Sequence, residues 1–115
     1  MSSLEQIIND AFENIKEVSP STTGPIRDAV EETLNQLDSG VLRVCEKVNG
    51  KWLVNQWTKK SILLSFRLND NYISSGSYAS WFDKIPGKTI NWTKEKHINS
   101  GFRSVPNAVV RKSAF

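Results

Sequence analysis

The sequence is poor in the side chains that catalytic and metal sites use most: it contains one cysteine, Cys45, and one histidine, His97. A lone cysteine forms no internal disulfide, which is consistent with a reducing compartment, and we expect a cytoplasmic protein. No cluster of cysteine and histidine has the spacing of a zinc site. We expect Cys45 to be a small core residue in a strand, and His97 to lie on the exposed face of a short helix. The sequence therefore predicts no catalytic residue and no metal site in this chain.

Long apolar runs and glycine-rich phosphate loops are missing as well. No apolar stretch approaches the roughly 20 residues that a transmembrane helix needs, so we expect no membrane span. No Walker or dinucleotide-binding glycine pattern is present, and we expect this chain to bind no cofactor. A length of 115 residues, with 38% apolar and 23% charged residues, fits one folded domain. We divide the chain into a domain at residues 1–100 and an extended segment at residues 101–115.

Charge is distributed unevenly along the chain. Residues 1–40 contain eight acidic side chains against two basic ones, whereas residues 41–115 contain thirteen Lys and Arg against four acids. Ten of the eleven aromatic residues also lie in the second part, and basic side chains beside aromatic ones are typical of single-strand binding surfaces. A small nucleic-acid-binding module is therefore one hypothesis. The other is that Trp52, Trp57 and Phe66 anchor the core, which we favour because no stretch matches a known RNA-binding motif.

Apolar residues recur at helical spacing near the amino terminus. Ser3 and Gln6 have the form of a capping box, and the apolar residues that follow fall on one face of a helix of about four turns. Pro25 suits the first turn of a second helix, in which the apolar residues of 26–37 have the same offsets. Gly40 can end that helix in a left-handed conformation. The sequence therefore predicts two amphipathic helices that form an antiparallel hairpin.

The period then changes to that of strands. Asn49-Gly50 is a strong two-residue turn signal between alternating residues and predicts a β-hairpin. Residues 57–68 fit a strand by alternation and a helix by length. This block also contains apolar residues that we expect to be buried: Ile62, Leu63, Leu64, Phe66 and Leu68. Residues 70–92 look like loop with short pieces, and Thr93 can cap a short helix. The expected fold class is α+β.

Arg103 is the strongest candidate for a binding residue. It lies between Phe102, which can pack, and a short extended run that Pro106 stiffens. A guanidinium presents a planar set of donors that binds a carboxylate through two charge-assisted hydrogen bonds. The hypothesis is an anion site at Arg103, with Phe102 as a weaker candidate. The alternative is an ordinary surface salt bridge.

The chain carries a series of short motifs: Val41-Leu-Arg-Val44, Gly50-Lys-Trp52, Gln56-Trp57, Lys59-Lys60, Leu63-Leu-Ser-Phe-Arg67, Asn69-Asp-Asn71, Phe82-Asp-Lys84 and Gly101-Phe-Arg103. In order and spacing, over essentially all 115 residues, these resemble the amino-terminal domain of the tetrahydrodipicolinate N-succinyltransferases. Asn107 departs from a second proline that is common after Pro106 in that family, which puts only local rigidity in doubt.

The resemblance implies a larger architecture. In this family a left-handed parallel β-helix of hexapeptide repeats follows the amino-terminal domain, and active sites form between neighbouring subunits of a homotrimer. Val109 and Phe115 are six residues apart, which is the period of such repeats. We therefore expect the chain to end where the β-helix, absent from it, begins. The resemblance also favours a helix for residues 57–68.

The resemblance further implies a reaction. The family transfers a succinyl group from the co-substrate succinyl-CoA to the amino group of tetrahydrodipicolinate, on the route to diaminopimelate and lysine. Arg103 would hold a carboxylate of this dicarboxylate acceptor. The acidic catalytic group and the coenzyme A contacts would lie beyond residue 115, so we expect the fragment alone to be inactive. The alternatives are the nucleic-acid-binding module and a non-catalytic oligomerisation domain.

Overall fold

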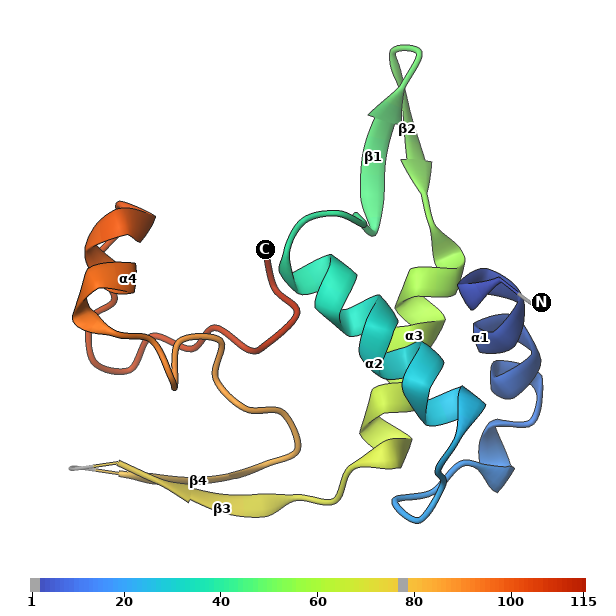
Figure 1. Cartoon of the computed structure of the whole chain (residues 1–115), viewed down its shortest axis with the longest axis horizontal. Coiled ribbons are helices and arrows are strands. Elements are labelled where there is room, and N and C mark those ends of the chain that lie inside the picture. Colours follow the sequence, from blue (N-terminus) through green and yellow to red (C-terminus); the bar gives the residue numbers. More distant parts are fainter. Residues whose placement is uncertain (1–2, 77–78) are drawn as a thin grey trace.

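A computed structural model describes residues 3–76 and 79–115 of the chain. Within these ranges, three helices form a bundle, two antiparallel strand pairs extend from it, and a short helix lies beyond the second pair (Figure 1). The α+β class expected from the sequence is confirmed. The elements are α1 (Leu4–Glu13), a 3₁₀ turn (Ile15–Glu17), α2 (Pro25–Asp38), β1 (Cys45–Val48), β2 (Lys51–Val54), α3 (Gln56–Leu68), β3 (Tyr72–Ser75), β4 (Ser80–Asp83) and α4 (Lys94–Ser100).

The core lies between α1, α2 and α3. Helix α1 begins at the expected cap, where the Ser3 hydroxyl accepts a hydrogen bond of 3.1 Å from the backbone N–H of Gln6. Pro25 opens α2, and Gly40 follows its end with a φ of 79°. Because each helix turns one apolar face inward, the three faces remove a continuous cluster from water. This cluster consists of Ile8, Ala11, Val18, Ala29, Val30, Leu64 and Leu68.

Residues 57–68 are helical and form most of α3. The buried positions of α3 recur every three or four residues, which places them on one face of a helix: Thr58, Ser61, Leu64, Ser65 and Leu68. Several of these are hydroxyl residues, and Thr58 donates to the backbone oxygen of Asn55 at 2.7 Å, so the buried face contains polar side chains. Leu63, which we expected to be buried, lies on the other side and is 47% exposed.

The strand pair β1–β2 stands away from the bundle (Figure 1). Asn49 and Gly50 join the two strands with positive φ angles of 51° and 77°. The side chain of Trp52 is 73% exposed, and Cys45 is exposed as well. The expectations that Trp52 anchors the core and that Cys45 is a core residue are therefore wrong, because no layer of the described chain covers this ribbon.

The second strand pair and α4 lie in the part of the chain for which the sequence predicted the least regular structure. β3 and β4 pair antiparallel, with Ile73 opposite Phe82, where the sequence predicted loop with short pieces. Residues 70–92 contain glycine, proline, asparagine and aspartate, which are depleted in strands, and these interrupt the aromatic residues and isoleucines, which hid the pairing. The expected short helix is confirmed: the Thr93 hydroxyl accepts from Lys96 N at 3.2 Å, and Gly101 ends α4 with a φ of 76°.

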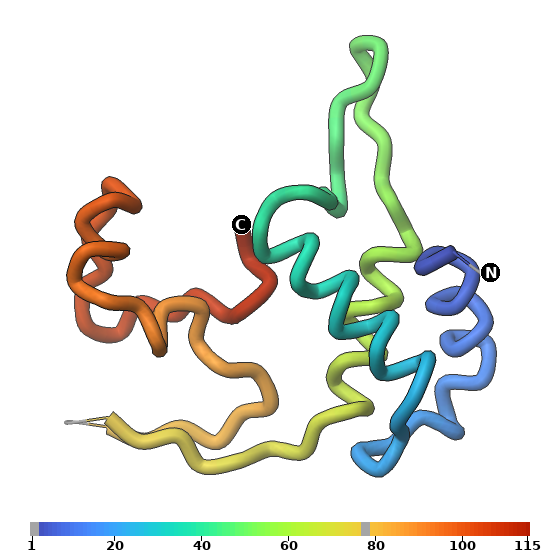
Figure 2. The backbone as a smooth tube through the Cα atoms, viewed as in Figure 1, coloured from blue at the N-terminus to red at the C-terminus, as the bar shows by residue number. Residues whose placement is uncertain are grey.

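After α4 the chain returns toward the bundle (Figure 2). Its last part pairs with the segment that follows β4, since Lys88 N donates to the Val110 oxygen at 2.8 Å and Lys112 N donates to the Pro86 oxygen at 2.9 Å. These backbone bonds tie residues 110–112 to residues 86–88. The stretch between them, which includes α4, therefore forms a loop whose two ends are hydrogen-bonded to each other.

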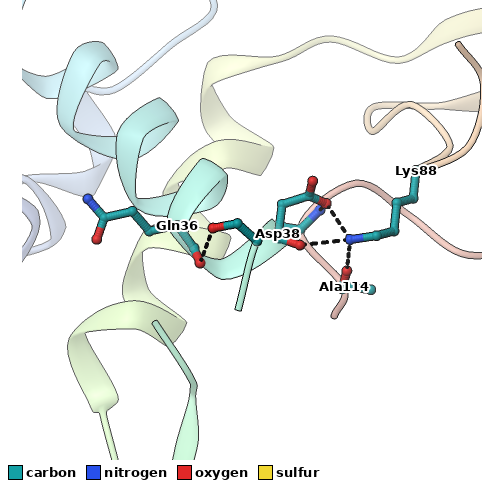
Figure 3. Close-up of polar contacts among 6 residues, drawn as sticks. Gln36, Asp38, Lys88 and Ala114 are labelled. Carbon is teal, nitrogen blue, oxygen red and sulfur yellow. Dashed lines mark hydrogen bonds and ion pairs between the residues drawn. The ribbon is translucent and has the colours of Figure 1, made fainter. Parts of the chain in front are cut away.

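Lys88 attaches the base of this loop to the end of α2 (Figure 3). The Lys88 ammonium donates to the Asp38 carboxylate at 2.9 Å and to the Asp38 backbone oxygen at 2.8 Å, and it also donates to the Ala114 oxygen. Ser113 N donates to the same carboxylate at 2.8 Å. A positive charge at the carboxyl end of a helix is favourable in itself. We call these four residues the Lys88 clamp.

The Lys88 clamp makes stability depend on pH. Burial raises the pKa of Asp38, but the hydrogen bonds from Lys88 and Ser113 and the charges of Lys88 and Lys112 outweigh it, so the pKa lies below its ordinary value of 3.8. A lowered pKa stabilises the fold above the unfolded-state value and loses that contribution as the pH falls through the folded-state value.

Replacing Asp38 by Asn tests this clamp. We expect Asp38→Asn to reduce the free energy of unfolding by about 1–2 kcal/mol at pH 7, because the amide keeps an acceptor but loses the charge. The difference should vanish well below pH 4, where the native carboxyl is protonated. Chemical denaturation of both proteins across this pH range measures it, and a pH-independent difference would contradict the charge-based account.

Ser61 offers a second test of the core. Its hydroxyl is buried in α3 and has no hydrogen-bond partner among the described residues, whereas the Ser65 hydroxyl donates to the Ile62 oxygen at 2.6 Å. Ser61→Ala removes an unsatisfied polar group and adds a better helix former, so we expect a gain of about 1 kcal/mol. The matched change Ser65→Ala should be neutral or destabilising. Equal effects of the two substitutions on the denaturation midpoint would refute the distinction.

Candidate functional site

The candidate binding segment begins where α4 ends. Gly101 takes the left-handed conformation and turns the chain, so that Phe102 packs against Trp92, with ring centroids 6.0 Å apart and planes at 59°. Phe102 keeps 47% of its surface exposed. The expectation that Phe102 packs beside Arg103 thus agrees with the structure, although its partner, Trp92, did not figure among the candidate residues.

The ring of Trp92 makes three contacts. The His97 ring meets it edge-on at 5.2 Å, the Lys96 ammonium lies over it at 5.2 Å, and Phe102 packs at its side. His97 is half-buried by this contact, so the expectation that it lies on an exposed helix face is only partly right. A signal was present in the sequence: Trp92 precedes the Thr93 cap and His97 is the fourth helical residue, which is the spacing of a hydrophobic staple.

Arg103 lies on the surface next to this aromatic contact. Its side chain is exposed, and it makes no hydrogen bond or ion pair with any residue of 3–76 or 79–115. Of the other arginines, Arg27 donates to the Leu68 oxygen at 3.0 Å and Arg111 pairs with Asp83 at 3.0 Å. Arg43 lies over the Phe115 ring at 4.9 Å and has no hydrogen bond or ion pair among the described residues. The salt-bridge alternative for Arg103 therefore does not hold within the described chain. Its donors are available to an anion from solution.

Arg111, in the same part of the fold, has a guanidinium that is bound by a carboxylate of the chain. Its Nε and Nη2 atoms donate to the two oxygens of Asp83 at 3.1 and 3.0 Å, a two-point pair. The pKa of Asp83 is lowered, chiefly by the backbone N–H of Lys84 and further by Arg111. Since Asp83 fixes the orientation of Arg111, we assign this pair to the structure and not to binding.

Two cavities flank the returning chain. One, of about 340 Å³, lies beside the strand pair β3–β4, and Ser104 and Asn107 form part of its wall. The other, of about 660 Å³, lies between α2, α3 and residues 111–115, with Arg43, Lys84 and Lys112 among its lining residues. Both volumes suit small ligands. The positive lining of the larger cavity favours anions.

The described residues offer binding chemistry but no assembled catalytic group. His97 packs on Trp92, and Cys45 lies on the ribbon β1–β2, far from α4 (Figure 1). Across residues 3–76 and 79–115, no three His, Cys, Asp or Glu side chains gather as a metal ion would require. None of the described helices is both long and apolar enough to cross a lipid bilayer. Arg103 contributes an exposed guanidinium that has no hydrogen bond or ion pair among these residues.

Comparison with known proteins gives these features a context. A family model described as "Tetrahydrodipicolinate N-succinyltransferase N-terminal" matches residues 3–68. A relative from Psychrobacter sp. (strain PRwf-1) is 52% identical over 115 residues, covering 98% of this chain and 42% of the relative. One from Pelagibacter ubique (strain HTCC1062) is 50% identical over 118 residues, covering 100% of this chain and 43% of the relative. One from Rhizobium rhizogenes (strain K84 / ATCC BAA-868) is 52% identical, with 100% and 41% coverage.

All three relatives are named 2,3,4,5-tetrahydropyridine-2,6-dicarboxylate N-succinyltransferase. The chain thus spans about two-fifths of the length of the curated relatives it matches. The family-model match alone covers more than half of the described chain, including the three-helix bundle and the ribbon β1–β2. The chain belongs to the tetrahydrodipicolinate N-succinyltransferase family, whose amino-terminal region it matches.

Proposed function

We propose that this chain is the amino-terminal part of an acyltransferase that moves succinyl from succinyl-CoA to the amino group of tetrahydrodipicolinate, in diaminopimelate and lysine biosynthesis. The observation that carries the proposal is the identity of 50–52% over 98–100% of the chain to relatives of that name. The nucleic-acid-binding alternative is not favoured, because family membership accounts for the whole sequence without it.

Within this function, Arg103 binds a carboxylate of the acceptor. Three features support the role: the guanidinium is exposed, it has no partner in the described chain, and its neighbour Phe102 is held by Trp92. An arginine on a fixed backbone loses less entropy on binding than one on a free loop. Phe102 contributes by fixing the segment and, more weakly, by contact with the apolar ring edge of the acceptor.

The tasks of the reaction are divided along the polypeptide. Transfer of an acyl group from a thioester to an amine needs positioned reactants, a group that takes the amine proton, and neutralisation of the acceptor's negative charge. This chain supplies the last of these through Arg103. We assign the proton-accepting group and the succinyl-CoA contacts to the part of the enzyme that the relatives contain and this sequence does not. The 115 residues alone are then inactive.

The proposed architecture follows the same division. Residues 1–100 form the α+β domain, and residues 101–115 lead to a left-handed parallel β-helix through which three subunits assemble in the cytoplasm. The six-residue interval between Val109 and Phe115 supports this continuation, as does the exposure of both side chains, 75% each, in positions where a following layer would cover them.

A chimera tests the proposal without reference to the native gene. These 115 residues replace the matching amino-terminal 42% of the Psychrobacter relative. We expect the chimera to transfer succinyl to the acceptor and the isolated 115-residue chain to transfer none. In the chimera, Arg103→Lys should raise the acceptor KM by about ten- to a hundredfold, because a two-point pair is lost.

Steady-state assays with each substrate varied in turn make the measurement. The KM for succinyl-CoA should stay unchanged, and Lys51→Arg, a conservative change at an exposed basic residue of the ribbon β1–β2, should leave both constants unaltered. An unchanged acceptor KM for Arg103→Lys would remove Arg103 from the site. An inactive chimera that folds and assembles would refute the proposed activity of this chain.

A further inference from the structure

We infer that Trp92 is the positioning residue for Arg103: it holds the backbone at residues 102–103 so that the guanidinium faces the acceptor. This inference rests on the proposed function and deepens it. The two residues are eleven positions apart, and no motif links them. Their connection is spatial and runs through Phe102, which is bonded to Arg103 on one side and packs on Trp92 on the other.

The geometry anchors Trp92 to helix α4. Trp92 lies just before α4, and its ring contacts two residues of that helix. The His97 ring centroid lies 5.2 Å from the Trp92 ring centroid, and the Lys96 ammonium lies over the Trp92 ring at 5.2 Å. The helix itself is capped at both ends, by Thr93 and by Gly101. The indole therefore has contacts that do not depend on Phe102. Phe102 packs on this indole, with the ring centroids 6.0 Å apart.

The consequence for Arg103 follows from chain connectivity. Gly101 takes a left-handed conformation, and residues 102–110 are exposed. The backbone hydrogen bonds given for this stretch lie further along the chain, from Ala108 N to the Val105 oxygen at 3.0 Å and from Lys88 N to the Val110 oxygen at 2.8 Å. The aromatic contact is the restraint nearest to Arg103. It fixes the backbone and leaves the guanidinium without an internal partner, which is the combination that a pre-organised anion site needs.

A purely structural role for Trp92 makes a different prediction. If the indole only stabilised α4 through His97 and Lys96, its loss would lower stability and would affect both substrates alike. If it acts through Phe102 on Arg103, its loss will affect the acceptor alone, and only while Arg103 can bind it. The two roles are therefore separable by a double-mutant cycle.

The experiment uses the chimera and measures kcat/KM for each substrate. Trp92→Ala should lower kcat/KM for the acceptor by about two- to tenfold, the range of one aromatic pair, with kcat/KM for succinyl-CoA unchanged at saturating acceptor. Phe102→Ala should do the same, the double variant should be no worse than either, and Trp92→Phe should restore most of the loss. The matched control is Trp52→Ala, on the exposed ribbon, which should change neither constant.

The cycle with Arg103 gives the decisive comparison. In an Arg103→Gln background, Trp92→Ala should have no further effect on the acceptor; a persistent effect would overturn the inference while the proposed function stands. No effect of Trp92→Ala in the wild-type background would overturn it equally, given a thermal unfolding curve that shows a folded variant. If Arg103→Gln itself leaves the acceptor constants unchanged, the proposed role of Arg103 fails, and the inference fails with it.

Discussion

The contact of Lys88 with the end of helix α2 is the interaction on which the placement of the second half of the molecule depends. One ammonium group meets the carboxylate and the backbone oxygen of Asp38 and the oxygen of Ala114 (Figure 3). Backbone bonds between residues 86–88 and 110–112 close the same region. The segment that carries Arg103 thus starts and ends at fixed points, although it contains little buried apolar surface of its own.

Several arginines of the chain hold the fold together through acceptors of the chain itself. Arg27 and Arg67 donate to backbone oxygens that join the helices and their loops, and Arg111 is paired with Asp83. These guanidinium groups satisfy acceptors of their own chain and have few donors left. Arg103 has an exposed guanidinium and no such acceptor among the described residues. This contrast, together with the packed neighbour Phe102, is the ground on which we propose Arg103 as the binding residue.

The sequence predicted well where periodicity and caps agree, as at the Ser3 cap, the Pro25 start of α2 and the Thr93 cap of α4. It was ambiguous for α3, because hydroxyl residues with local hydrogen bonds occupy its buried face and weaken the apolar period. It misplaced Cys45, since alternation marks a strand without saying whether anything covers it. Arg103 could be proposed from its neighbours, whereas Trp92 required the fold, because only the turn at Gly101 brings Phe102 onto it.

The central claim is that a pre-positioned guanidinium of this domain contacts the acceptor in the assembled enzyme. A crystal structure of the chimera with the acceptor dicarboxylate bound tests it most directly. The account predicts Arg103 nitrogens at about 2.7–2.9 Å from both oxygens of one carboxylate, with the backbone of residues 101–103 unchanged from that described above. An acceptor bound with both carboxylates on other residues, and Arg103 facing solvent, would contradict it.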